Sequence, residues 1–193
     1  YNLTMLELNN FFLNGSEPTK KETKQFYDKC TNNKNMNFYQ IDISKKALKF
    51  SQEMNLCKKG INVNLETEKL NLLESLPKID IVIATGCVGY IGYKAFLNLL
   101  KIIKNRQLNS KKSEKEFITP IFAFSVLRMF DMNDIEEVFE MYDYSIVKSD
   151  IKPIHQRSFS DVKEKAQTIS ILHEREIDTK EYEDEGNFYA DFY

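Results

Sequence analysis

Residues 78–92 constrain the fold of this chain more than any other segment. A mainly apolar run, Ile79–Ala84, leads directly into a turn of small residues, Thr85-Gly86-Cys87-Val88-Gly89, and a helical pattern follows. Strands that are apolar almost throughout belong to parallel sheets with both faces covered, and ligands bind at the carboxyl ends of such strands. The segment therefore predicts a buried parallel strand that leads into a ligand-facing loop.

Size and charge limit the class of protein. The 193 residues suffice for one well-buried core, so we expect a single domain over residues 1–193. The 27 Lys and Arg residues nearly balance the 29 Asp and Glu residues, and the formal net charge of -2 disfavours nucleic acid as a partner. No apolar run approaches the roughly 20 residues of a membrane span, and no signal-peptide pattern opens the chain. We expect a soluble, cytoplasmic protein without a membrane partner.

The three cysteines lie far apart and have no metal-ligand spacing with the two histidines, so we expect reduced thiols and no metal site. Nothing in the sequence indicates an oligomeric state.

Strand-like and helix-like patterns alternate along the chain. Strands are predicted at residues 4–8, 37–42, 61–65, 80–85, 119–126, 144–147 and 188–193. Helices are predicted after the N-cap Ser44 as far as Gly60, and at residues 70–76, 93–104, 133–142 and 166–174. Residues 105–116 are predicted to be a solvated loop and residues 153–165 to be irregular. This alternation predicts an α/β protein with a parallel sheet that ends in an antiparallel hairpin.

Two carboxylates follow predicted strands. Asp42 ends the second strand, where a carboxylate hydrogen-bonds ribose hydroxyls in nucleoside-binding α/β folds, although capping of the next helix is at least as common a role. Glu66 follows the third strand and is either an acceptor for an adenine amino group or a solvated turn residue.

The turn after the fourth strand places Thr85, Gly86, Cys87 and Tyr90 on the crevice side. Small residues let a cofactor approach the backbone, and Tyr90 either stacks on a flat ring or packs in the core. Cys87 has no base near it in sequence, so a small buried thiol is favoured over a nucleophile.

Two later basic positions are ambiguous. Arg128, past the fifth strand, either forms an ordinary ion pair or anchors a substrate. His155 either accepts a proton from a nucleophile or is a surface residue, and Arg157 beside it has the same ambiguity.

The order of these segments resembles the class I S-adenosylmethionine-dependent methyltransferases. The resemblance rests on Glu7 at the end of the first strand, on Ile41-Asp42-Ile43-Ser44, and on the strand from Asp80 to Thr85. More narrowly, a poorly characterised bacterial group of that superfamily is similar over nearly the whole chain. The strings that carry this similarity are Thr85-Gly86-Cys87-Val88-Gly89-Tyr90, Phe124-Ser125-Val126-Leu127-Arg128-Met129-Phe130, Gln156-Arg157-Ser158-Phe159 and the end from Phe188 to Tyr193.

The resemblance implies a Rossmann-like fold, a seven-stranded, mostly parallel sheet with helices on both faces and a C-terminal antiparallel hairpin. It implies S-adenosylmethionine as the cofactor and an unidentified small molecule as the methyl acceptor. The implied cofactor-binding residues are Glu7, Asp42, Ile43, Leu65, Glu66, Thr85, Gly86 and Cys87, with Asp42 on the ribose. Candidates for a catalytic role are His155, Tyr90 and Arg128.

One element departs from the family pattern. Such enzymes carry a glycine turn directly after the first strand, whereas Leu8 is followed by Asn9-Asn10-Phe11-Phe12 and no glycine occurs before Gly15. Either the loop is degenerate, or this 193-residue chain omits a glycine-bearing segment between Leu8 and Asn9; we favour the omission. The alternatives to a methyltransferase are a non-catalytic binding or interaction protein of the same fold and, ranked lowest, a nicotinamide dehydrogenase.

Overall fold

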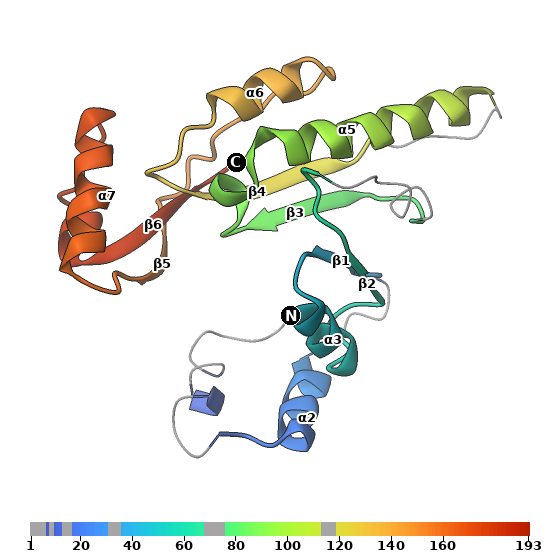
Figure 1. The fold of residues 1–193 in the computed structure, drawn as a ribbon, viewed down its shortest axis with the longest axis horizontal. Helices are drawn as coiled ribbons and strands as arrows, with labels where there is room; N and C mark the ends of the chain where they lie inside the picture. The colour runs from blue at the N-terminus through green and yellow to red at the C-terminus, as the bar shows by residue number, and fades with distance from the viewer. Residues whose placement is uncertain (1–6, 8–9, 13–16, 31–35, 68–75, 113–118) are drawn as a thin grey trace. The chain divides into compact units, whose positions relative to one another are not determined.

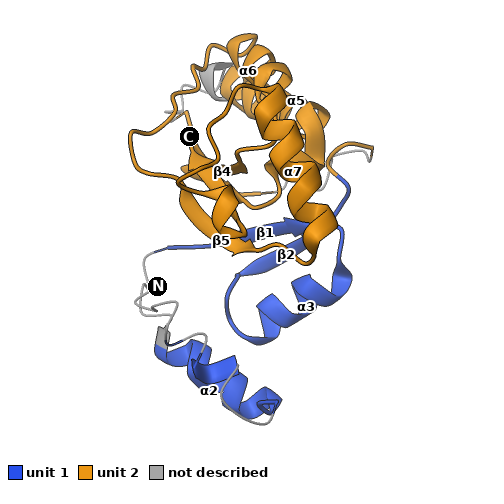
Figure 2. Ribbon diagram, turned by 90° about the vertical axis from the view of Figure 1, so that its left-hand side faces the viewer, with its two compact units in different colours: residues 1–64 blue, residues 65–193 orange. Residues whose placement is uncertain are grey.

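The computed structural model describes residues 7, 10–12, 17–30, 36–67, 76–112 and 119–193. Its contacts divide the chain into two compact units, unit 1 (residues 1–64) and unit 2 (residues 65–193), coloured separately in Figure 2. Each unit has its own small sheet, with two strands in unit 1 and four in unit 2.

Unit 1 contains a strand–helix–strand segment preceded by the helix α2 (Lys20–Cys30). The strands β1 (Tyr39–Asp42) and β2 (Lys59–Asn62) pair in parallel, and α3 (Lys45–Glu53) connects them. Ser44 is the N-cap of α3, as predicted, because its hydroxyl accepts the backbone N–H of Ala47 at 3.2 Å. The apolar side chains that this segment buries are Leu48, Met54, Ile61 and Val63.

The end of α3 differs from the prediction. Gly60 does not terminate the helix but lies within β2. The helix ends at Glu53 with Met54 as its C-cap, and Asn55 takes the left-handed conformation (φ 57°) that a glycine was expected to supply. A Cβ at residue 60 would lie 3.0 Å from the Leu48 side chain, so glycine serves close packing of β2 on α3.

Unit 2 contains the larger sheet, with strand order β3-β4-β6-β5 (Figure 1). The strands are β3 (Ile81–Thr85), β4 (Ile121–Leu127), β5 (Ile154–Ser158) and β6 (Asn187–Phe192). β3 and β4 are parallel, whereas β6 is antiparallel to both of its neighbours. The helices are α5 (Val88–Lys112), α6 (Asn133–Glu140), α7 (Val162–Glu174) and the short 3₁₀ helix η1 (Glu183–Glu185).

The core of unit 2 lies between the sheet and the helices α5 and α6, which run along one side of β3 and β4 in Figure 1. Its centre consists of Phe96, Phe124 and Phe139, one from each of α5, β4 and α6, whose ring centroids lie 5.2–5.7 Å apart. Tilted and edge-to-face pairs of this kind add to the stabilisation from apolar burial. This packing fixes the β3–α5 turn relative to the end of β4.

The predicted seven-stranded, mostly parallel sheet is wrong. The described residues form six strands in two separate sheets, and only β1–β2 and β3–β4 are parallel pairs. Glu7, predicted to end the first strand, is helical and exposed, and the rest of the 4–8 strand lies outside the described residues. Most of the predicted 70–76 helix also lies outside them.

The C-terminal strands are an antiparallel pair, but not the predicted hairpin. Residues 144–147 form no strand, because Tyr144 and Ile146 pack onto the α5–α6 core from a loop, which gives them an alternating pattern. The strand instead is β5, within the segment predicted to be irregular, and α7 separates it from β6. β5 is an edge strand held by its backbone, so its sequence shows no apolar alternation.

The helix after the small-residue turn is longer than predicted. α5 continues to Lys112, through residues predicted to be a loop, and it has a kink at Gly92 (φ 57°, ψ 171°). None of the helices in the described part of the chain is both long and apolar enough to span a bilayer.

Candidate functional site

The carboxyl ends of β3 and β4 in unit 2 present an open stretch of backbone. Thr85, the last residue of β3, is in register with Ser125, and the Gly86 N–H donates to the Ser125 hydroxyl at 3.3 Å. Gly86 has φ 68°, and a Cβ built there would meet no atom within 4 Å. The chain thus takes a glycine-favouring conformation beside empty space, where a ligand could contact the backbone.

The first turn of α5 packs tightly against the segment after β4. A Cβ at Gly89 would lie 2.0 Å from the Phe130 ring, so only glycine fits there. Phe130 is held by its backbone N–H, which donates to the Leu127 carbonyl at 2.9 Å. Tyr90 meets the Phe130 ring edge-on at 5.1 Å and keeps 64% of its surface exposed. Phe130 therefore supports an exposed aromatic side chain next to the Gly86 turn.

Two further predicted cofactor residues, Leu65 and Glu66, lie against α5. The Asn98 side-chain amide donates to the Leu65 carbonyl at 2.7 Å. A Cβ at Gly92 would lie 2.9 Å from a carboxylate oxygen of Glu66, so the absence of a side chain at the kink makes room for this carboxylate. The structure therefore brings Leu65 and Glu66 to the same helix that begins at the Thr85–Cys87 turn.

Three predicted cofactor residues lie in unit 1. The Asp42 carboxylate accepts the Ser44 N–H at 2.7 Å, an Asx-type contact just before α3, whereas Ser44 and not Asp42 caps the helix. The Asn62 side chain donates to the carbonyls of Asp42 and Ile43, at 3.1 and 2.8 Å. Glu7 lies in a helical turn and is exposed. Asp42 and Ile43 thus form an ordered strand end.

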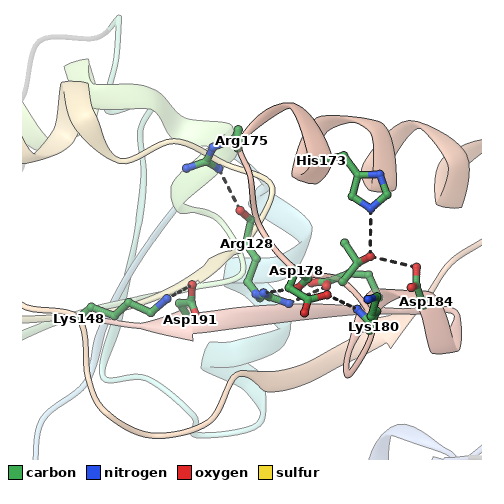
Figure 3. A network of polar contacts seen from close by, with 10 residues as sticks. Arg128, Lys148, His173, Arg175, Asp178, Lys180, Asp184 and Asp191 are labelled. Carbon is green, nitrogen blue, oxygen red and sulfur yellow. Dashed lines mark hydrogen bonds and ion pairs between the residues drawn. The ribbon is translucent and has the colours of Figure 1, made fainter.

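Arg128 belongs to a buried polar network at the end of β4 (Figure 3). Its guanidinium donates to Glu183 at 2.6 Å and to the Asp178 carbonyl at 2.9 Å, and it lies 4.6 Å from the centroid of the Tyr182 ring. Arg175 donates to the Arg128 carbonyl at 2.9 Å. The guanidinium thus connects β4 to the chain before β6, in the ion-pair role that the sequence left open.

The same network contains a second buried chain of polar contacts. The hydroxyl of Thr179, which is almost fully buried, donates to Asp184 at 3.1 Å and contacts the His173 ring at 3.3 Å. Lys148 pairs with the buried Asp191 at 2.6 Å. The Thr179 contacts hold η1 in place, and the Lys148 pair connects the loop before β5 to β6.

A β-bulge in β5 separates His155 from Arg157. His155 is paired with Tyr189 and Arg157 with Phe188, so Gln156 is the extra residue on the bulged strand. Residues 155 and 157 of a regular strand would share a face, but consecutive residues of β6 point to opposite faces. The ring centroids of His155 and Tyr189 accordingly lie 5.7 Å apart on one face. On the other face, the Arg157 guanidinium carbon lies 4.5 Å from the centroid of the Phe188 ring.

Arg157 lies on the side of the sheet that carries Phe130. Leu127, Phe188 and Ala190 form a small buried cluster, and Phe130 packs against it. Tyr90 in turn packs on Phe130. The Tyr90, Phe130 and Arg157 side chains thus gather around one cluster, whereas the His155 ring packs on Tyr189.

Two ion pairs in unit 2 contain glutamates whose pKa values are shifted in opposite directions. Arg157 donates to both carboxylate oxygens of Glu164, at 2.7 and 3.0 Å. Together with the Ser160 N–H, this pair lowers the pKa of Glu164 to about 2, and it raises the pKa of Arg157. In the other pair, burial raises the pKa of Glu183, and the charge of Arg128 opposes the shift only in part.

Sequence reasoning missed Ser125 and Phe130 as site residues. Both lie within the strings that carry the family resemblance, Phe130 directly after Met129, but nothing in the pattern says that they face the Gly86 turn. The bulge at Gln156 also has no sequence signal, because it depends on pairing with β6. Within the described ranges, no group of three or more His, Cys, Asp and Glu residues could hold a metal ion.

Comparisons of the chain with models of protein families, with curated proteins and with solved structures find no match.

Proposed function

We propose that the chain is an S-adenosylmethionine-dependent methyltransferase that acts on a small molecule. The observation that carries the proposal is the left-handed Gly86, which follows a parallel strand and has open space beside it. Ligands bind at this end of parallel strands, and a backbone without a side chain lets a cofactor approach closely. The resemblance of the motifs Thr85–Tyr90 and Phe124–Phe130 to those of class I methyltransferases is the reason for proposing this cofactor rather than another nucleoside.

The described residues of unit 2 fit such a cofactor. The Gly86 turn offers backbone to the methionine portion, and the exposed Glu66 offers a carboxylate to an amino group. When bound, the cofactor supplies a methyl group activated by its positively charged sulfur.

The protein's own contribution is mainly orientation. Holding the two reactants in line accounts for a large share of the rate in such transfers, and excluding water prevents side reactions. Of the three catalytic candidates, Tyr90 lies beside the Gly86 turn, so its hydroxyl is the group proposed to orient the methyl acceptor by a hydrogen bond. Arg128 is engaged with Glu183, and His155 packs on Tyr189.

Calorimetric titration with S-adenosylmethionine and its demethylated product tests the proposal. Gly86→Ala adds a methyl group where the cofactor approaches, and we expect it to weaken binding roughly tenfold or more. Gly186 is a matched control, because it also has a positive φ (97°) and no atom within 4 Å of a built Cβ. Both substitutions cost about 1–2 kcal/mol of stability through the left-handed backbone, but Gly186→Ala leaves binding unchanged.

The binding data also separate the alternatives. Absence of binding by folded wild-type protein would overturn the proposal and favour a non-catalytic protein. Binding of NAD in preference to S-adenosylmethionine would favour a dehydrogenase.

A further inference from the structure

Arg157 has hydrogen-bonding capacity that its known contacts do not use. A guanidinium has five N–H donors. Three serve Glu164 and the Ser158 carbonyl, through Nη1 twice and Nη2 once. The Nε–H and the second Nη2–H have no partner among the described residues, and half of the side-chain surface is exposed. These two donors form one fork of the guanidinium, which matches the two oxygens of a carboxylate or phosphate.

The position of this fork is fixed by its surroundings. Glu164 holds the guanidinium from one edge, and the buried Phe188 ring supports its face at 4.5 Å. The bulge at Gln156 turns the side chain to this face of β5. Bulges are over-represented next to active sites, where they redirect a side chain. An arginine held in this way loses little conformational freedom when an anion binds.

Aromatic surface lies close to the fork. Phe130 packs on the cluster that contains Phe188, and the exposed Tyr90 leans on Phe130. A ligand anchored on the guanidinium could therefore lay an apolar or flat portion on Tyr90, toward the Gly86 turn.

We propose that Arg157 and Tyr90 form an oxyanion-binding subsite, and that the methyl acceptor carries a carboxylate or phosphate group next to a flat portion. The identification of this ligand as the methyl acceptor rests on the proposed function, whereas the oxyanion site does not. Glu164 positions the guanidinium and remains bound to it when the anion occupies the second fork.

Titration of the full chain with benzoate, acetate and inorganic phosphate at constant ionic strength tests the subsite. The Nε–H resonance of Arg157 in the ¹⁵N-labelled protein reports on the fork, and Arg157→Lys assigns it. We expect it to move in a saturable way with benzoate, and to saturate at a higher concentration of acetate, which lacks a ring. A response to phosphate but not to carboxylates would identify the anion as a phosphate. A resonance that no anion moves would overturn the proposal.

Three variants separate binding from structure, with binding followed by the backbone amides of Gly89 and Tyr90. Arg157→Lys keeps the charge but removes the fork and should weaken benzoate binding roughly tenfold. Arg106→Lys, on α5, is the control and should bind as the wild type does. Glu164→Gln releases one edge of the guanidinium but keeps the fork, so it should weaken benzoate binding less than Arg157→Lys does. Equal binding by all three variants would overturn the proposal.

The two proposals fail in different ways. Movement of the Arg157 resonance by benzoate without any binding of S-adenosylmethionine would contradict the proposed function alone. Binding of S-adenosylmethionine with an Arg157 resonance that no anion moves would contradict only the oxyanion subsite.

Discussion

Arg128 and Arg157 both pair with a glutamate and both lie over an aromatic ring, at 4.6 Å for Tyr182 and 4.5 Å for Phe188. They differ in exposure. Arg128 is 9% exposed and Glu183 is 1% exposed, whereas Arg157 is 50% exposed. Burial makes the first pair part of the packing, while exposure leaves the second arginine accessible to a ligand. An arginine–glutamate pair can therefore stabilise the fold when it is buried, or leave the arginine available to bind a ligand when it is exposed.

Removing the buried arginine should have the largest effect on stability. Arg128→Met leaves the Glu183 carboxylate buried without its cation, which costs about 3–5 kcal/mol. Urea unfolding measures the loss. The double variant with Glu183→Gln should recover part of it, because the uncompensated charge is gone. A loss below about 1 kcal/mol for Arg128→Met would show that the pair is not part of the packing.

Disturbing the contact between the β3–α5 turn and Phe130 should cause the second-largest loss of stability. Gly89→Ala places a methyl group against the Phe130 ring, and such overpacking costs about 1–3 kcal/mol. Phe130→Leu in the same chain should relieve the clash, so the two substitutions together cost less than their sum. Strict additivity in thermal unfolding would contradict this contact.

Replacing the exposed arginine should change stability little. Arg157→Lys loses the two-pronged contact with Glu164, and exposed ion pairs contribute about 0.2–1 kcal/mol. The contrast with Arg128→Met, measured in the same urea series, tests the comparison directly. An equal loss for both variants would show that exposure does not distinguish the two pairs.

The two glutamates should give opposite pH dependences. The pKa of Glu164 is lowered from its ordinary 4.5 to about 2, so its contribution is present above 4.5 and is lost as the pH falls toward 2. The pKa of Glu183 is raised, so its contribution is present below 4.5 and is lost as the pH rises through the higher folded-state value. Unfolding free energies at several pH values, with Glu164→Gln and Glu183→Gln as controls, check both signs. A wild-type slope that neither variant changes would contradict the assignments.

The sequence was sufficient where local chemistry decides the structure. The Ser44 cap, the strand β3 and the helical pattern of α6 all depend on neighbouring residues, and the structure confirms them. The predicted burial of β3 is wrong, because Ile81 and Ile83 on one of its faces are exposed. Elements that depend on distant partners were missed. β5 exists because β6 pairs with it, and Tyr144 looked like part of a strand because the core formed by α5 and α6 buries it.

In the candidate site, too, features set by neighbouring residues could be predicted and features set by distant residues could not. The turn at Thr85–Gly86 could be located from the sequence, because a glycine that directly follows an apolar strand usually indicates a turn. The separation of Arg157 from His155 could not, because a bulge changes the face of a side chain without changing the residue type. The burial of Arg128 likewise depends on Glu183, which lies 55 residues away in the chain.

The most direct test of the proposed cofactor site compares the backbone amide resonances of Gly86 and Gly186 during titration with S-adenosylhomocysteine. Both glycines have positive φ and open surroundings, but only Gly86 directly follows a parallel strand. We expect the Gly86 amide to shift in a saturable way, while the Gly186 amide stays in place. A Gly86 amide that does not move, or equal shifts for the two glycines, would contradict a cofactor site at the end of β3.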